Sequence, residues 1–156
     1  MSVWSVSVQA QPFDVGAEIA ALGAGDKGIG AIVSFVGLVR DMNEGEGVSS
    51  MTLEHYPGMT ERALEDIVAE ARGRWDLMGA RVIHRFGPLD PGDGIVLVVV
   101  AGAHRGEAFA ACEFIMDYLK TRAPFWKKEV GAGGPETARW VDARDADDSA
   151  AERWKN

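Results

Sequence analysis

The chain has 156 residues, 47% hydrophobic and 26% charged, a composition typical of one globular domain covering 1–156. Its formal net charge of −8 argues against a general nucleic-acid binder, which would present a basic surface. Because there is one cysteine, no signal-peptide pattern and no apolar run near the roughly 20 residues of a membrane span, we expect a cytoplasmic protein without disulfides.

The first half of the chain alternates amphipathic and apolar stretches. Asp14 and Thr60 are good helix N-caps, because each precedes apolar residues at helical spacing. The segment 41–47 holds acids, asparagine and glycine but nothing to bury, so we expect a mobile surface loop there. The predicted elements are helices at 14–22 and 60–75 and mostly buried strands at 31–39 and 48–56.

The second half has the same mixture and ends in an acidic tail, about 145–156, that is predicted to be helical. A long helix at 106–122 should end before Pro124, because proline disfavours the helical conformation of the preceding residue. Its expected core-facing residues are Phe109, Cys112, Ile115, Met116 and Leu119. The predicted strands are 82–86, 95–101, 125–130 and 139–143. Since neighbouring strands are joined by turns as well as by helices, the fold class is α+β.

A basic cluster stands out against the acidic background in the stretch KTRAPFWKKE, from Lys120 to Glu129. Lys120 lies in the last helical turn, where a cation interacts favourably with the helix dipole. Lys127 and Lys128 follow on an extended segment and therefore point to opposite faces. One of them can turn back toward Lys120, although a solvated helix end next to an edge strand protected by lysines is the commoner arrangement.

Two further places suit an anion. His104 and Arg105 stand where the central strand meets the long helix, and the free N–H groups of a helix N-terminus attract phosphate or carboxylate. Ordinary loop polarity explains this pair equally well. Arg40 ends the first buried strand near Gly37, which allows close backbone approach of a ligand, but taken alone it is more simply a surface charge.

The remaining histidines favour structural roles. His55 lies in LEHYPGMTE, which already makes sense as a strand, a turn and a helix start, and His84 lies in an alternating strand. Three scattered histidines and one cysteine give no metal-ligand spacing, so we expect no metal site. The sequence also lacks the glycine motifs of P-loops, dinucleotide-binding folds and serine-hydrolase elbows.

Taken together, LEHYPGMTE, the Ile83-His84-Arg85 strand, AHRGEAF and FIMDYLKTRAPFWKKE closely resemble the large subunit of molybdopterin synthase, from about Gln11 to Arg153. The resemblance implies an α/β hammerhead fold with an additional antiparallel β-subdomain. It also implies a cofactor-free sulfurtransferase of molybdenum cofactor biosynthesis, which converts cyclic pyranopterin monophosphate (precursor Z) to molybdopterin. The sulfur would come from the C-terminal thiocarboxylate of a small ubiquitin-like sulfur-carrier subunit, and two large subunits would pair within a heterotetramer.

Residue roles follow from the same resemblance. Lys120 and Lys127 match the family's two catalytic lysines, and His104 and Arg105 match its anion-binding pair. In the family the pocket lies near the interface between the two large subunits, so some of these residues would serve the partner's site. The substrate-binding residues implied are Leu38, Val39, Arg40, His104, Arg105, Lys120, Lys127, Lys128 and Glu129.

The chemistry fits this assignment, because the pocket must hold a phosphate-bearing pterin and an anionic thiocarboxylate together, and arginine offers bidentate contacts to phosphate. Crowding cations around a partly desolvated amine favours its neutral form, so a lysine can act as acid or base or attach covalently. Two other functions stay open on the residues alone. One is a module that binds a phosphorylated small molecule or single-stranded nucleic acid on Phe125, Trp126 and the adjacent lysines, and the other is a non-catalytic structural subunit.

Overall fold

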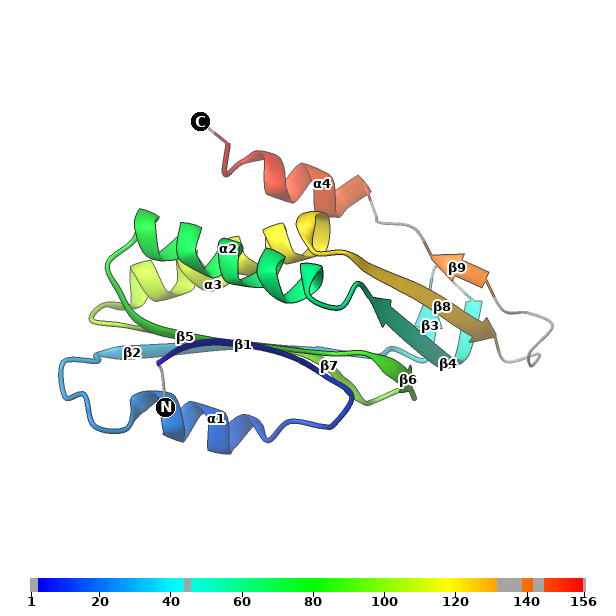
Figure 1. Cartoon of the computed structure of the whole chain (residues 1–156), viewed down its shortest axis with the longest axis horizontal. Coiled ribbons are helices and arrows are strands. Elements are labelled where there is room, and N and C mark those ends of the chain that lie inside the picture. The colour runs from blue at the N-terminus through cyan, green and yellow to red at the C-terminus, as the bar shows by residue number, and fades with distance from the viewer. Residues whose placement is uncertain (1–2, 44–45, 132–138, 142–144, 156) are drawn as a thin grey trace.

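The computed structural model describes residues 3–43, 46–131, 139–141 and 145–155, which form two β-sheets flanked by helices (Figure 1). Two helices cover one face of the first sheet, one helix covers the opposite face, and the last helix lies on the outer side of the helical layer. The two helices on one face are α2 (Met59–Arg74) and α3 (Arg105–Arg122), and the helix on the opposite face is α1 (Val15–Gly23). The last helix is α4 (Asp145–Glu152). No helix within the described ranges is long and apolar enough to cross a membrane.

The first sheet is mixed and has the strand order β1-β5-β7-β2. The pair β1 and β5 is parallel, and the other two pairs are antiparallel. The two central strands are buried on both faces, which explains why β7 is a continuous apolar run. The bounds are β1 (Trp4–Gln9), β2 (Ala31–Leu38), β5 (Leu77–Arg85) and β7 (Gly94–Gly102).

The second sheet is antiparallel, with the order β3-β4-β8-β9 and with β6 also paired to β4. It stands at the end of the molecule where α3 finishes (Figure 1). Its strands are β3 (Met42–Asn43), β4 (Glu46–His55), β6 (Gly87–Leu89), β8 (Phe125–Gly131) and β9 (Arg139–Val141). A helix-covered sheet joined to an antiparallel β-subdomain confirms the predicted α+β fold.

Alternation along β7 divides the core of the first sheet into two layers. Val96, Val98 and Val100 pack with α2 and α3 in the larger hydrophobic cluster. Leu97 and Val99 point the other way and pack with α1. The two layers bury both faces of the sheet, and this burial is the main stabilising contribution to the fold.

β1 is absent from the elements predicted from the sequence, and β5 begins earlier than the predicted strand at 82–86. Trp4, Val6 and Val8 alternate with polar residues, which is the period-two pattern of a half-buried strand. β1 pairs with β5 along its whole length, from Trp4 opposite Ala80 to Gln9 opposite Arg85. The predicted strand at 82–86 therefore covers only the end of β5, which is one of the two central strands of the sheet.

Part of the expected loop at 41–47 is a short β-hairpin. Met42 pairs with Gly47 and Asn43 with Glu46, so β4 begins before the predicted strand at 48–56. Residues 44–45 and 142–144 lie outside the described residues, and the expected mobility of the loop stays a prediction. The predicted C-terminal strand and acidic helix are confirmed as β9 and α4.

The start of α2 differs from the prediction, because Thr60 is not its N-cap. Gly58 takes that position with a φ of +83°, a left-handed conformation that suits glycine, and its N–H donates to Glu61 at 3.0 Å. The Thr60 hydroxyl accepts from the Tyr56 N–H at 2.9 Å and donates to the Pro124 carbonyl at 3.1 Å. A fully buried threonine therefore joins the start of α2 to the corner between α3 and β8.

The core-facing stripe of α3 is also corrected at one position. Phe109 was expected in the core, but its side chain is 60% exposed. Cys112, Ile115, Met116 and Leu119 are buried as predicted. The stripe begins at Ala108, so Phe109 lies one residue, about 100° of helical rotation, away from its centre.

Replacing Thr60 with valine should destabilise the protein. Thr60→Val keeps the shape of the side chain but removes both hydrogen bonds, leaving the Pro124 carbonyl without its donor in a buried corner. We expect the free energy of unfolding to fall by about 1–3 kcal/mol, measured by urea denaturation. The matched control is Thr121→Val, because the Thr121 hydroxyl bonds only to carbonyls of its own helix. Equal losses in the two variants would contradict the tethering role of Thr60.

Candidate functional site

Lys120 lies in the last turn of α3, beside the corner that leads into β8. The helix stops at Arg122 because Ala123, which precedes Pro124, takes an extended conformation. Arg122 is engaged elsewhere, since it pairs with Glu70 of α2 at 3.0 Å and its guanidinium lies 3.7 Å from the centroid of the Tyr118 ring. The Lys120 side chain is exposed and is therefore the better placed cation of this turn for a ligand.

The register of β8 puts Lys127 and Lys128 on opposite faces of the second sheet, as predicted. Lys127 lies opposite Leu53, and Lys128 lies opposite Thr52. Leu53 is buried, so Lys127 is on the inner face and is half-buried, whereas Lys128 is exposed on the outer face. Glu129 follows in the same strand, and its side chain lies outside the described part of the chain.

Four aromatic rings join the two sheets beside these lysines. The His84 ring stacks on Phe125, with centroids 3.6 Å apart and planes inclined by 17°. His55 packs against Phe86 with centroids 4.3 Å apart, and it lies opposite Phe125 in the register of β4 and β8. We call these four residues the ring seam. Because Lys127 is two residues after Phe125 and on the same face, the ring seam fixes the direction in which Lys127 points.

His84 is a buried ring whose surroundings include both lysines. Its ring is 5% exposed, and its Nδ1 lies 2.8 Å from the Arg85 carbonyl oxygen. Burial, with smaller contributions from the nearby Lys120, Lys127 and His55, lowers the pKa of His84 to about 3. Lys120 comes from α3 and Lys127 from β8, so two different elements carry a positive charge into the surroundings of this buried ring.

Leu38, Val39 and Arg40 leave β2 at this end of the molecule. Val39 is buried with Leu53 in the small cluster of the second sheet, on the inner face shared with Lys127. The Val39 N–H donates to the Asp93 carbonyl at 2.9 Å, and its own carbonyl accepts from Gly92 at 2.7 Å. This pairing holds the backbone that presents the exposed Leu38 and Arg40 side chains, while substrate contact by these three residues stays a prediction.

A shallow cavity of about 490 Å³ lies next to this segment. Arg40 lines it together with Val39, Asp41, Pro91 and Gly92. Gly92 has a φ of +93°, which lets the chain turn tightly against Val39. The volume is within the range of small-molecule sites, and the guanidinium gives the cavity a group that binds phosphate.

His104 and Arg105 lie at the opposite end of the molecule. His104 is the N-cap of α3 and Arg105 its first residue, and both side chains are exposed. At 1.5 Å per residue, α3 separates Arg105 from Lys120 by roughly 22 Å. One chain therefore does not bring the predicted anion-binding pair to the predicted catalytic lysines.

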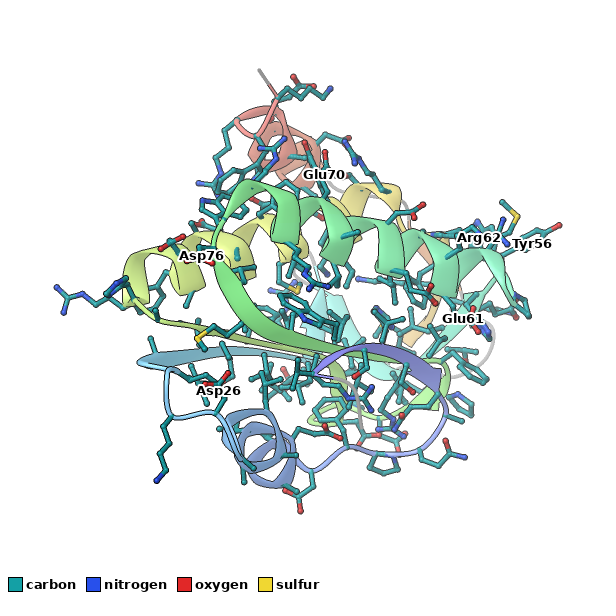
Figure 2. All side chains as sticks on the ribbon, turned by 60° about the vertical axis from the view of Figure 1, so that its left-hand side comes forward. Asp26, Tyr56, Glu61, Arg62, Glu70 and Asp76 are labelled. Carbon is teal, nitrogen blue, oxygen red and sulfur yellow. The ribbon has the colours of Figure 1, made fainter. Side chains whose placement is uncertain are left out.

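Figure 2 makes the two ends visible through two of its labelled residues. Asp76 marks the beginning of α3, because its N–H donates to Glu107 in the first turn of that helix at 2.8 Å. Tyr56 marks the other end, because it is joined through Thr60 to the corner after α3. The two labels lie on opposite sides of the view, which agrees with the length of the helix.

Cys112 is unsuited to sulfur chemistry. Its side chain is buried, and burial, with a smaller effect of Glu113, raises the pKa of the thiol to about 12. A thiol that keeps its proton is a poor nucleophile. Within the described ranges, no group of three histidine, cysteine or acidic side chains could hold a metal ion. The candidate chemistry therefore rests on amines and guanidinium groups.

Comparison with known proteins places this arrangement in a family. Residues 8–122 match the family model described as MoaE protein. This matched range includes Arg40, His104, Arg105 and Lys120. The chain belongs to the MoaE family. Lys127 lies beyond the matched range, so its role in the site stays a prediction.

One such MoaE relative is the molybdopterin synthase catalytic subunit of Ralstonia nicotianae, 65% identical over 150 residues, which are 96% of this chain and 84% of the relative. The solved molybdopterin biosynthesis MoaE protein from Burkholderia ambifaria has a TM-score of 0.82 and 53% identity, covering 97% of both chains. A more distant structure is a complex of subunits 1 and 2 of molybdopterin-converting factor from Helicobacter pylori, with a TM-score of 0.68, 21% identity and 92% coverage of both chains. That last likeness shows the fold alone.

The part of the site that the sequence did not indicate is the ring seam. His55 and His84 are predicted to be structural, and the packing of their rings against Phe86 and Phe125 agrees with that prediction. Nothing in the local sequence shows that Lys120 and Lys127 gather around His84, because the three residues come from separate elements. The Pro91-Gly92 pair signals a turn, but not that the turn borders the Arg40 cavity.

The lowered pKa of His84 predicts that stability falls as the pH decreases. In the unfolded chain this histidine binds a proton near pH 6.5, whereas in the folded protein it does so only near pH 3. Between these values the unfolded state holds more protons, so lowering the pH favours unfolding. We expect a contribution of about 1.4 kcal/mol per pH unit between about pH 6 and pH 4. Urea denaturation at several pH values measures this slope.

The comparison variant for this slope is His84→Phe, which keeps a stacked ring but has no group to protonate. Its free energy of unfolding should fall less steeply with decreasing pH than that of the wild type. His104→Ala, at an exposed position, should keep the wild-type slope. If the free energy of unfolding of the wild type and of His84→Phe changed with pH in parallel, the lowered pKa of His84 would be disproved.

Proposed function

We propose that this chain acts as the catalytic subunit of a molybdopterin synthase, a sulfurtransferase that converts cyclic pyranopterin monophosphate to molybdopterin. Membership of the MoaE family and 65% identity to a molybdopterin synthase catalytic subunit, over 96% of the chain, support the activity. The assignment of Lys120 and Lys127 as its catalytic residues is supported chiefly by one observation, their positions on either side of the corner where Phe125 stacks on the buried His84.

The sulfur donor in this proposal is the C-terminal thiocarboxylate of a small ubiquitin-like subunit. The Ralstonia nicotianae relative is named a catalytic subunit, which supports an enzyme made of more than one kind of chain. A thiocarboxylate is an anion, and Lys120, Lys127 and Lys128 give the end of α3 and the start of β8 the opposite charge. Such a sulfur species persists in a reducing compartment, so we place the protein in the cytoplasm.

The chemistry asks these residues to move protons and to hold anions. Attack by the thiocarboxylate sulfur forms a carbon–sulfur bond on the pterin and an acyl thioester, and the displaced oxygen leaves with a proton. Water then cleaves the thioester, so that the small subunit departs as a carboxylate and the sulfur stays on the pterin. In this proposal Lys120 and Lys127 donate and accept these protons, and Arg40, which lines the cavity, holds the phosphate.

We further propose that two chains complete each site. Arg40, Lys120 and Lys127 lie at one end of a chain, and His104 and Arg105 lie roughly 22 Å away at the start of α3. In a two-fold dimer, the far end of one α3 can approach the near end of its partner. His104 and Arg105 would then bind the substrate held by the other chain, within a heterotetramer of two large and two small subunits. In this proposal, as the family resemblance implies, Lys128 and Glu129 would border the same pocket.

The stacked ring of Phe125 weakens the alternative of a nucleic-acid binder. One face of this ring is already occupied by His84, with centroids 3.6 Å apart, which leaves less of it for a base. Trp126 is 47% exposed, and one aromatic side chain on a chain of net charge −8 is a poor platform for a polyanion.

Lys120→Ala and Lys127→Ala should each lower turnover by at least about 100-fold, because each removes an amine that transfers protons. The measurement is molybdopterin formed from the pterin precursor by the purified chain and the thiocarboxylated small subunit. Both variants should bind the small subunit and unfold at the same urea concentration as the wild type.

Lys27→Ala is the matched control, since Lys27 is an exposed lysine outside the site, and it should keep full turnover. Normal product formation by Lys120→Ala, with the small subunit bound, would refute its catalytic role.

Mixing two inactive variants tests whether sites are shared between chains. Lys120→Ala and Arg105→Ala homodimers should each turn over slowly. After subunit exchange, random pairing gives half mixed dimers, each with one intact site, so roughly a quarter of the wild-type activity should return. If all the residues of a site came from one chain, mixing would restore nothing. Exchange is followed independently by native mass spectrometry of differently tagged chains.

A further inference from the structure

His84 is a buried titratable group to which the proposed chemistry gives no role. Its ring lies at the end of β5, is 5% exposed and is stacked on Phe125. A phenylalanine would provide the same stacking and would bury no polar atom. The presence of an imidazole at this position must therefore be explained by its two nitrogens.

The two nitrogens of His84 have different roles. Nδ1 lies 2.8 Å from the Arg85 carbonyl, and because a carbonyl oxygen only accepts, Nδ1 carries the proton. The lowered pKa keeps the ring neutral at ordinary pH, so Nε2 retains its lone pair. Within the described part of the chain, no group donates a hydrogen bond to Nε2. A buried acceptor without a donor is costly, and such groups are usual where a ligand or a moving side chain completes the site.

Lys120 is the best matched donor. Three cationic or titratable groups act on His84 from the elements around it: Lys120 of α3 most strongly, then Lys127 of β8 and His55 of β4. Across the described residues, no hydrogen bond or ion pair occupies the Lys120 amine. The His84 ring stacks on Phe125, and Phe125 follows the last turn of α3 directly after the Pro124 corner, so a side chain from that turn lies close enough to approach Nε2.

We propose that Nε2 of His84 accepts a hydrogen bond from the Lys120 ammonium in the working site, which makes His84 a positioning residue for sulfur transfer. This inference rests on the proposed function. A lysine side chain has many rotamers, and one fixed acceptor selects the rotamer that aims the amine at the reacting groups. A neutral imidazole can hold an ammonium, whereas a charged one would repel it.

The stacked position of His84 explains why it suits this task. The Arg85 carbonyl fixes the tautomer, and the Phe125 ring fixes the plane of the imidazole. Phe125 is also the first residue of the strand that carries Lys127. The same stack therefore sets the acceptor for one lysine and the backbone position of the other.

Two variants separate positioning from packing. His84→Phe keeps the stacked ring without the acceptor, and His84→Gln restores an acceptor oxygen near the place of Nε2 without the ring. In the complex with the thiocarboxylated small subunit, we expect His84→Phe to lower kcat at least about tenfold with KM nearly unchanged. His84→Gln should recover most of the lost kcat. Wild-type kcat in His84→Phe, or a His84→Gln variant as slow as His84→Phe, overturns the inference.

A spectroscopic measurement decides the matter even if His84→Phe fails to fold. The 15N resonance of His84 Nε2 is recorded in the full-length chain bound to the small subunit, with Lys120→Met and the matched exposed control Lys27→Met. Loss of the donor should move the Nε2 resonance in Lys120→Met and leave it in place in Lys27→Met. An unchanged resonance in Lys120→Met overturns the inference.

The two measurements also separate this inference from the proposed function. A wild-type chain that forms no molybdopterin would count against the proposed function, while the Nε2 resonance would still report the contact with Lys120. A wild type that turns over, together with an Nε2 resonance insensitive to Lys120, would leave the enzyme assignment intact and remove His84 from it.

Discussion

The stack of His84 on Phe125 is the contact on which this end of the molecule depends. It joins the last residue but one of β5 to the first residue of β8, and so fixes the helix-covered sheet against the antiparallel one. Lys120 precedes the corner between them and Lys127 follows it, so their amines are positioned by a contact that neither lysine makes. A rigid supporting layer of this kind is what a site needs if flexible side chains are to act at defined places.

Local patterns in the sequence predicted what depends on neighbouring residues. Asp14 caps α1 as expected, and α3 ends where Pro124 requires it. The predictions were wrong where contacts between distant segments determine the structure. β1 is held by its pairing with β5, and the Thr60 hydroxyl bonds to the Pro124 carbonyl instead of capping α2. The same limit applies to the site, because the approach of Lys120 and Lys127 to His84 depends on tertiary packing. The separation of Arg105 from Lys120, in contrast, follows directly from their positions on one helix.

The distribution of charge explains how an acidic chain can attract anions. Glu70 of α2 pairs with Arg122 at 3.0 Å and lies 3.8 Å from Arg74, so these arginines neutralise the helical surface rather than the site. Lys120, Lys127 and Arg40 lie at the end where the two sheets meet. The net charge of −8 on the whole chain makes this local positive region more selective, because polyanions such as nucleic acids meet repulsion over most of the surface.

α3 also acts as a spacer whose length matters more than most of its surface residues. Arg105 and Lys120 stand at its two ends. In the proposed dimer, the cations around Arg105 and those around Lys120 would serve different pterin molecules. Inserting or deleting a single residue between them would change the span by only about 1.5 Å but would rotate one end against the other by about 100°. Homologues should therefore tolerate substitutions on the exposed side of this helix, around Phe109, far better than any change in the number of its residues.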